Sequence, residues 1–554
     1  MNDPIQHPGL NERARGWLRF IWEKATREED WSSTGDPHPS WDRYSTAPMC
    51  AFPRFDVSET SYALPLMVDQ TPAWREVYTR IADELVGRYT TFWGAVDWLT
   101  LIGPDPHQGK YPPEWLVYMP EALRGHYDPP GWTANGVAPW GLQPDPIAAD
   151  GNLFFRGFFN LLLATYSYVS GDDKWERPFK MTGYQDRLYD WTQHSITAFI
   201  EDQWAERPQG AHCENTKVWP YCLSAAGLSL QLYDKIFDAK THWVYDQWID
   251  YAKQHFTTRN SKGDIESFAF YYDPIEKMAY SLRDRLAGYS TLAPLFYLYP
   301  QAPEFGQELY ESGIEQLGWN KRSGKFVQTI DDPRWLTMVL MLAREIGDQT
   351  TMQRLTDAAE QEFGPDFFSD DPDRFAWCFG LEEPYPRGQL NGLMILSEIG
   401  ECGAWTNVYT GSYEPQFDLP TVEGVDYPSV GVNVAYNDPD TSTLHVSTYA
   451  AASAERGKPT QWRVSNLPGT QGVKLYCDGS LFEHWRASGA NTITIDSTVD
   501  AHDFQILWQG AKAEFETTEP STTQASAQTE VASVAGAAPA AQYRPAAPPS
   551  CACC

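Results

Sequence analysis

The sequence predicts a mainly α-helical protein followed by a small all-β domain. Apolar side chains recur at helical spacing over most of 10–405, and the segments they define follow one another as pairs. Near residue 405 the pattern changes to short runs of β-branched residues between turn signals. Paired helices over 55–405 favour an α/α barrel, with a helical solenoid as the alternative.

Each predicted helix carries apolar residues three or four positions apart. The predicted helices are 10–30, 61–67, 73–93, 151–171, 184–204, 220–237, 242–256, 286–300, 304–318, 332–348 and 388–400. The predicted strands are 429–438, 442–452, 460–467, 473–479 and 491–497.

These elements divide the chain into four parts. We expect an N-terminal helical segment and loop at 1–45, the barrel at 46–406 and the all-β domain at 407–516. The last part, 517–554, is dominated by Ala, Ser, Thr and Pro and cannot build a core, so it is predicted to be disordered.

Charge and composition narrow the function. The 74 acidic and 42 basic residues give a formal net charge of −32, which disfavours nucleic acid and anionic membranes as partners. No signal peptide and no membrane-spanning run is visible, and nine cysteines in 554 residues are too few for a disulfide scaffold. A cytoplasmic protein with reduced thiols is predicted, and a homo-oligomer stays open.

Motifs for nucleotides and metals are absent from the sequence. It contains no P-loop, no GxGxxG, no HExxH and no GxSxG, and its 11 His form no pair at i, i+4 among acids. The sequence therefore gives no indication of a nucleotide cofactor or a metal site.

Two cysteines nine residues apart are the main candidates for chemistry. The spacing of Cys213 and Cys222 fits neither a zinc pair nor a CxxC redox motif. Pro220 suits the first turn of a helix, which would place Cys222 where the helix dipole favours a thiolate. Two thiols of different acidity could donate and accept a proton. The alternative is that both are small buried apolar groups.

Four segments resemble the linalool dehydratase-isomerase family. They are the cysteine segment 212–234, the helix 151–176 with its Arg-Gly and Asn-Leu pairs, the Tyr-x-Pro segment 270–280, and 340–355 with Ala-Arg-Glu-x-Gly-Asp-Gln. The resemblance implies an (α/α)6 barrel that removes water from, or moves the hydroxyl of, an allylic tertiary alcohol by acid–base catalysis without a cofactor. Cys213 and Cys222 fall on the positions that shuttle protons in that family.

The resemblance also implies an early catalytic Asp before an aromatic segment. Asp42, followed by Tyr44, is the nearest match, and Asp56 competes with it. Tyr62, later in the same helix as Asp56, is expected to reach the cavity. The alternative for Asp56 is a capping box with Glu59 at the start of that helix.

Other positions complete the predicted site. Tyr272 matches the family's Tyr-x-Pro segment and is a catalytic candidate. Phe158 stands where the family has a His after the Gly, which predicts a more apolar pocket or another proton donor. His212, beside Cys213, is a replacement imidazole, and the predicted substrate-binding aromatics include Trp93 and Trp219.

The sequence therefore predicts a lyase or isomerase for a terpene-like or other hydrophobic alcohol or alkene. Dehydration, hydration, double-bond migration and cyclisation through a carbocation-like state all stay open. The alternative is a carbohydrate-active barrel, a hydrolase or lyase, that uses paired carboxylates drawn from Asp42 or Asp56 and Glu382 or Glu383. A non-catalytic binding protein is the third hypothesis.

Overall fold

The computed structural model describes most of the helical and strand-rich parts of the chain. The described residues are 8–26, 53–90, 145–149, 151–183, 187–213, 217–274, 277–282, 285–320, 333–363, 365–368, 371–377, 379, 388–413 and 415–508, with the short strands 100–101, 117–118, 137–138, 141–142 and 325–326. The predicted tail at 517–554 lies outside them.

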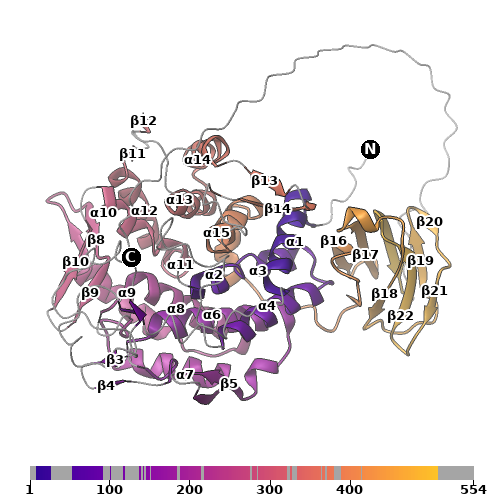
Figure 1. The fold of residues 1–554 in the computed structure, drawn as a ribbon, viewed down its shortest axis with the longest axis horizontal. Helices are drawn as coiled ribbons and strands as arrows, with labels where there is room; N and C mark the ends of the chain where they lie inside the picture. Colours follow the sequence, from indigo (N-terminus) through magenta and orange to yellow (C-terminus); the bar gives the residue numbers. More distant parts are fainter. Residues whose placement is uncertain are drawn as a thin grey trace, which may run out of the picture.

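Helices make up most of the first part (Figure 1). They are α1 (Glu12–Thr26), α2 (Pro53–Glu59), α3 (Leu64–Gln70), α4 (Glu76–Tyr89), α6 (Leu153–Ser170), α7 (Gln193–Ala205), α8 (Pro220–Phe237), α9 (Trp243–His255), α10 (Arg285–Leu292), α11 (Leu295–Leu298), α12 (Pro303–Gln316), α13 (Pro333–Ile346), α14 (Gln349–Glu362), α15 (Gly388–Ile399) and α16 (Ala404–Thr410).

Contacts between these helices close into a ring. Helix α2 packs on α6, α6 on α8, α8 on α11, α11 on α13, α13 on α15, and α15 returns to α2. Helices α1, α4, α7, α9, α12 and α14 alternate with the ring helices along the chain and flank them. The apolar faces of α6 and α8 explain their place, since nearly every residue of α6 is buried.

Small residues let the ring helices approach closely. A Cβ on Gly157 of α6 would lie 2.9 Å from Cβ of Ala226 on α8, and one on Gly392 of α15 would lie 2.1 Å from the carbonyl oxygen of Glu59 on α2. Glycine is therefore required where α2 and α15 cross, and the crossing fixes the backbone at Glu59.

Short hairpins connect the helices, which the helical periodicity did not predict. They pair β5 (Phe179–Thr182) with β6 (Leu188–Trp191), β7 (Thr257–Arg259) with β8 (Ile265–Phe268), β9 (Tyr271–Asp273) with β10 (Met278–Tyr280), β11 (Trp319–Asn320) with β12 (Lys325–Phe326), and β13 (Pro365–Phe368) with β14 (Asp371–Trp377). Two-residue strands pair β1 (Thr100–Leu101) with β2 (Val117–Tyr118) and β3 (Val137–Ala138) with β4 (Gly141–Leu142).

Two predicted helices are wrong in extent, and one matched segment spans two helices. The segment 184–204 begins with strand β6, and α7 starts only after Thr192, whose side chain caps the backbone N–H of Ser195. The segment 286–300 breaks at Pro294 into α10 and α11, because proline has no N–H to continue a helix. The matched segment 340–355 is two helices.

Local signals explain that last break. Gly347 has φ +79°, which ends α13, and the carboxylate of Asp348 accepts the N–H of Thr351 at 3.2 Å to cap α14. The other predicted helices are confirmed within a few residues at each described end.

The strand-rich part is a pair of antiparallel sheets. One has the order β15-β18-β22-β21 and the other β16-β17-β23-β19-β20. The strands are β15 (Thr421–Glu423), β16 (Val430–Asp438), β17 (Thr443–Ala450), β18 (Pro459–Ser465), β19 (Lys474–Cys477), β20 (Ser480–Leu481), β21 (Trp485–Ala487), β22 (Ile493–Thr498) and β23 (His502–Leu507).

The sheets pack face to face through apolar side chains. The rings of Trp462 on β18 and Phe504 on β23 lie 5.2 Å apart, centroid to centroid, so the core lies between the sheets. The predicted strands are confirmed. The predicted boundary between 406 and 407 is wrong, because it falls inside α16 and the first strand begins at Thr421.

The two parts are joined by hydrogen bonds and aromatic packing. The carboxylate of Glu76 accepts the N–H groups of Gly424 and Val425, both at 2.8 Å, and the ring of Tyr427 packs against Trp22 and Trp74. In Figure 1 the strand-rich part lies beside α1 and α4 accordingly. Among the described helices, none is long and apolar enough to cross a membrane.

Candidate active site

A small cavity of about 30 Å³ opens inside the ring of helices. Its described lining comes from α2, α8, α10, α13 and α15, and from Trp219 just before α8. The lining residues are Phe55, Trp219, Tyr221, Cys222, Tyr289, Arg334, Met338 and Gln389. Four aromatic rings and one thiol therefore face two polar side chains, Arg334 and Gln389.

Cys222 is the thiol in this cavity. It is the third residue of α8, behind Pro220 at the first helical position, so its predicted place in the first turn is confirmed. Its sulfur is free and the residue is 6% exposed. The N-terminal end of an 18-residue helix supplies a positive partial charge beside the sulfur.

Cys213 lies in the loop that leads into α8. It is fully buried, and its backbone N–H donates to the carbonyl of Lys217 at 2.7 Å. It is not among the described lining residues of the cavity, so its predicted contact with the substrate stays a prediction. The neighbouring His212 is partly buried, and its carbonyl accepts the N–H of Leu153 at the start of α6 at 3.2 Å.

A buried carboxylate lies behind the cavity. Oε1 of Glu59 accepts hydrogen bonds from the hydroxyls of Tyr221 at 2.8 Å and of Tyr297 at 3.2 Å, and the hydroxyl of Tyr297 lies 2.7 Å from that of Tyr62. Glu59 is fully buried. These four side chains, which we call the Glu59–tyrosine network, connect α2, α8, α11 and the turn between α2 and α3.

Burial and charge keep the tyrosines of this network protonated. Desolvation, and next the negative charge of Glu59, raise the pKa of Tyr62, Tyr221 and Tyr297 well above the usual value. Tyr221 directly precedes Cys222, and both residues line the cavity. The structure therefore holds a chain of proton-bearing groups within a few ångströms of one another.

Aromatic rings form the wall of the same region. The ring of Phe158 lies 5.2 Å from Phe55, 5.8 Å from Tyr221 and 5.7 Å from Tyr297. Phe158 is fully buried. The position predicted to make the pocket more apolar is thus packed against a cavity-lining ring and against the Glu59–tyrosine network.

Tyr272 lies on β9 and contacts α9. Its backbone pairs with Val218, and its hydroxyl accepts a hydrogen bond from Tyr251 of α9 at 3.2 Å while its ring stacks on Phe256. Burial is the largest cause that raises the pKa of Tyr272 to about 12. It is absent from the described lining of the cavity, so its catalytic role stays a prediction.

Several predicted site residues cannot be placed. Asp42, Tyr44 and Trp93 lie outside the described residues. Asp56 lies within α2, and its side chain is outside the described set. The capping box predicted for Asp56 and Glu59 is wrong, because α2 begins at Pro53 and ends at Glu59.

Sequence reasoning missed the roles of Glu59, Tyr221, Arg334 and Gln389. A signal existed for two of them. Glu59 lies three residues before Tyr62, and Tyr221 is the neighbour of Cys222 in an otherwise apolar helix start. No local pattern marks Arg334 or Gln389, because only the closure of the ring brings α13 and α15 to α8.

The segment that carries both cysteines is also the part of the chain that matches a known family. Residues 139–372 match the family model described as linalool dehydratase/isomerase. This confirms the predicted resemblance to the linalool dehydratase/isomerase family over that segment. It contains Cys213, Cys222 and Tyr272, whereas Asp56, Glu59 and Tyr62 lie before it.

Solved structures show a weaker likeness. Endoglucanase CelQ from Clostridium thermocellum with cellotriose has 11% sequence identity and a TM-score of 0.32, and the match covers 90% of this chain and 93% of that one. A GH127 β-L-arabinofuranosidase from Geobacillus stearothermophilus T6 has 12% identity, a TM-score of 0.28, and coverage of 89% and 75%. A likeness at these TM-scores defines neither the fold nor the activity of this chain.

Proposed function

We propose that this protein is a cofactor-independent lyase or isomerase that acts by acid–base catalysis on a terpene-like or other hydrophobic alcohol or alkene. One observation carries the proposal. Cys222, within the segment that matches the linalool dehydratase/isomerase family, lines an aromatic cavity from the first turn of a helix. The closed ring of helix contacts supports the finer assignment of an (α/α)6 barrel around that cavity.

In the dehydration direction, a thiol proton goes to the hydroxyl oxygen of the substrate. The C–O bond then breaks with its electron pair on oxygen, water leaves, and an allylic cation remains. A base removes a proton from the neighbouring carbon, and the C–H electron pair forms the new double bond. Cys222 and Cys213 are the proposed donor and acceptor, and the thiolate left by the first step can serve as the base.

The aromatic wall supports a cationic intermediate. Ring faces attract a cation through their quadrupoles, and the attraction is worth about 2 kcal/mol or more when water is excluded. Phe55, Trp219, Tyr221 and Tyr289 line the cavity, and Phe158 packs behind them. The apolar lining also favours a hydrocarbon substrate over a sugar.

The Glu59–tyrosine network is the proposed support of the proton transfer. The bond from Tyr221 to Glu59 fixes the side chain next to Cys222 and links the cavity to a buried carboxylate. Arg334 and Gln389 are the proposed groups that orient the substrate hydroxyl, since they are the polar side chains of the described lining. The free sulfurs of Cys222, Cys402 and Cys477 support a reducing, cytoplasmic setting.

The test is turnover of two substrate panels by the full chain, followed by mass spectrometry. A panel of allylic and tertiary isoprenoid alcohols should yield products that have lost water, or isomers of equal mass with the hydroxyl moved. An oligosaccharide panel should remain intact. Cleavage of oligosaccharides would favour the carbohydrate-active alternative, and binding of an isoprenoid alcohol without turnover would favour a binding protein.

A further inference from the structure

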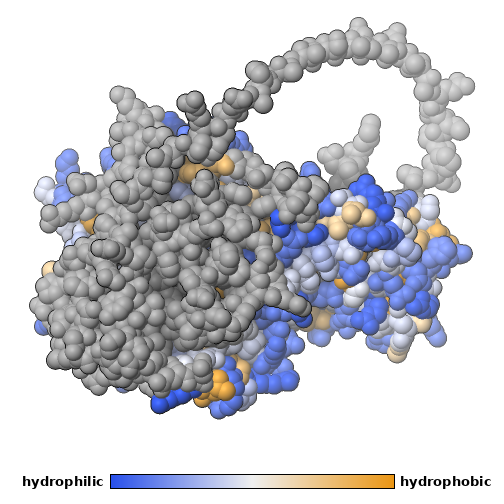
Figure 2. Space-filling view, viewed as in Figure 1, coloured by the Kyte–Doolittle hydropathy of each residue, from blue (hydrophilic) through white to orange (hydrophobic). Residues whose placement is uncertain are grey.

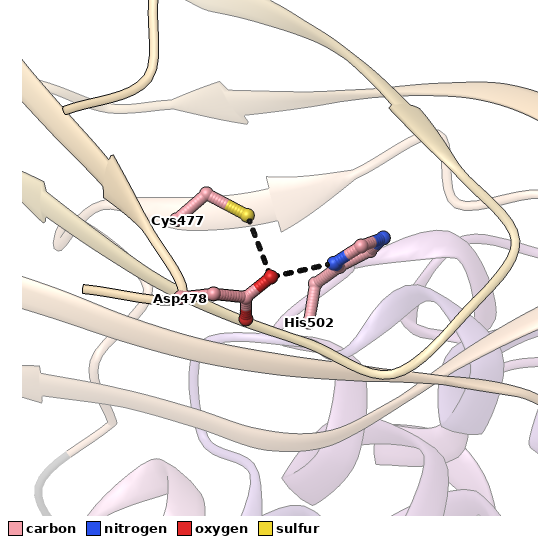
Figure 3. Close-up of side chains that lie close together, drawn as sticks. All are labelled: Cys477, Asp478 and His502. Atoms are coloured by element: carbon pink, nitrogen blue, oxygen red, sulfur yellow. Dashed lines mark hydrogen bonds and ion pairs between the residues drawn. The ribbon is translucent and has the colours of Figure 1, made fainter. Parts of the chain in front are cut away.

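A cysteine, an aspartate and a histidine lie close together where strand β19 ends and strand β23 begins (Figure 3). Oδ2 of Asp478 lies 3.5 Å from Sγ of Cys477 and 3.0 Å from Nδ1 of His502. One ligand atom from each of the three residues lies within 4.8 Å of the other two. None of the three belongs to the cavity or to the Glu59–tyrosine network.

The three side chains stand on a rigid frame. Cys477 ends β19 and His502 begins β23, and these adjacent strands pair Cys477 with Phe504. The backbone makes a tight turn between β19 and β20, because φ is +51° at Asp478 and +78° at Gly479. With this positive φ, the carboxylate of Asp478 lies over the first residues of β23. The backbone N–H of Asp478 donates to the carbonyl of Asp503 at 2.9 Å.

The atoms of Asp478 and His502 that point away from the cluster are already held. Oδ1 of Asp478 accepts the N–H of Asp503 at 2.9 Å, which leaves Oδ2 toward Cys477 and His502. Nε2 of His502 lies 3.0 Å from Oγ1 of Thr498, which fixes the ring and leaves Nδ1 toward Asp478. Outer hydrogen bonds of this kind orient metal ligands and set their tautomer.

We propose that Cys477, Asp478 and His502 bind a zinc-class divalent metal ion through Sγ, Oδ2 and Nδ1. Thiolate, imidazole and carboxylate are the ligands that Zn²⁺ takes in proteins. In a tetrahedral zinc site the S···O and N···O separations are about 3.6 Å and about 3.4 Å. The two separations here, 3.5 Å and 3.0 Å, need shifts of a few tenths of an ångström to match.

Charge and access also fit a cation. The carboxylates of Asp478 and Asp503 act electrostatically on the Cys477 thiol, so its surroundings are electronegative. The side chain of Asp478 is 54% exposed and that of His502 23%, so an ion can enter and a fourth ligand can come from water.

The same geometry argues against a nucleophilic triad. The carboxylate lies between the thiol and the imidazole, whereas a catalytic triad needs the imidazole next to the thiol to take its proton. Binding of a metal ion, with release of the thiol proton to solvent, is the chemistry that the arrangement supports.

The experiment uses the full chain with Cys551, Cys553 and Cys554 changed to Ser, because those thiols could also take a metal. Titration with Co²⁺ should give the thiolate-to-cobalt charge-transfer band and the visible bands of a tetrahedral site. Competition with Zn²⁺ then gives the zinc affinity. Cys477→Ser should remove the charge-transfer band, and His502→Ala should weaken zinc binding at least about 10-fold. Thr498→Val, which removes only the bond to Nε2, should weaken it about 10- to 100-fold.

Matched controls keep the assignment specific. Cys402→Ser removes another exposed thiol, and His484→Ala removes another exposed imidazole of the strand-rich part, and both should leave the band and the affinity unchanged. Circular dichroism of each variant checks that the sheets are intact. A parent protein without the charge-transfer band would overturn the site. So would an unchanged band in the Cys477→Ser variant, since the thiolate would then belong to another cysteine.

Discussion

Cys222 and Cys477 place the same thiol in two opposite settings. Cys222 starts a helix among aromatic rings, beside a tyrosine that donates to the buried Glu59. Cys477 ends a strand at a partly exposed edge, beside a carboxylate and an imidazole. The first setting suits a proton passed to an apolar substrate, and the second suits a lasting bond to a cation. The different chemistry proposed for Cys222 and Cys477 therefore follows from the residues around each thiol and not from the thiol itself.

The largest expected effect is on turnover. Cys222→Ser should lower turnover of an isoprenoid alcohol about 10²- to 10⁴-fold, because a serine hydroxyl is far too weak an acid to replace the thiol. Cys213→Ser should have a similar effect if that thiol is the second proton carrier. Steady-state rates measured by gas chromatography check both variants.

Cys477→Ser is the matched control for this comparison. It should retain the rate of the unchanged protein, since the proposed reaction takes place in the helical ring. A large loss of turnover in Cys477→Ser with normal turnover in Cys222→Ser would reverse the roles of the two thiols.

The next effect concerns the carboxylate behind Cys222. Glu59→Ala removes the acceptor of two buried hydroxyls, and each unsatisfied hydroxyl costs about 1–3 kcal/mol of the free energy of unfolding. Glu59→Gln keeps an acceptor oxygen and should cost less stability, while still lowering turnover. Urea unfolding and rate measurements on both variants separate the two effects. Equal stability of Glu59→Ala and the unchanged protein would show that the network does not hold the site.

A smaller effect tests the helix crossing that fixes Glu59. Gly392→Ala would put a Cβ 2.1 Å from the carbonyl oxygen of Glu59, so α2 and α15 must separate at a cost of about 1–3 kcal/mol. Gly87→Ala on α4 is the control, because a Cβ there meets nothing within 4 Å and should stabilise the protein by about 0.4–1 kcal/mol. Opposite shifts in thermal midpoint are expected, and a neutral Gly392→Ala would mean that the crossing is looser.

The smallest effect is a pH dependence. Tyr221 has a pKa raised in the folded state by burial and by Glu59, so above pH 10.0 the unfolded chain loses this proton first. Stability should therefore be intact below pH 10.0 and fall above it, by at most about 1.4 kcal/mol per pH unit for this one group. Tyr221→Phe should make the fall shallower by that amount in urea unfolding at pH 10 and 11. If stability fell equally with pH in Tyr221→Phe and in the unchanged protein, the hydroxyl of Tyr221 would be exposed to water in the folded state.

Helical periodicity predicted the helices well because each ring helix has a broad apolar face. It failed where one residue decides, because Pro294 splits the predicted helix 286–300 into α10 and α11. It also failed for the hairpins, whose strands of two to seven residues are too short for a periodic signal. The sandwich strands were predicted because β-branched residues and turn signals alternate there.

The candidate site was only partly predictable, since neighbours in space are not neighbours in sequence. Cys222 could be predicted from Pro220 and the family resemblance. The three-residue spacing of Asp56 and Glu59 fits a capping box, so the sequence suggested a capping role for Glu59. In the folded protein, Glu59 instead accepts a hydrogen bond from Tyr297, which is 238 positions away. The cluster at Cys477 went unnoticed because β19 and β23 bring together residues 24 and 25 positions apart.

The most direct test of the account is a crystal structure of the full chain with a non-reactive analogue of a tertiary isoprenoid alcohol. We predict that the hydrocarbon lies against Phe55 and Trp219 and that the hydroxyl oxygen lies within about 4 Å of Sγ of Cys222, a hydrogen-bond distance for sulfur. An analogue bound on the strand-rich part, or a disulfide between Cys213 and Cys222, would contradict it.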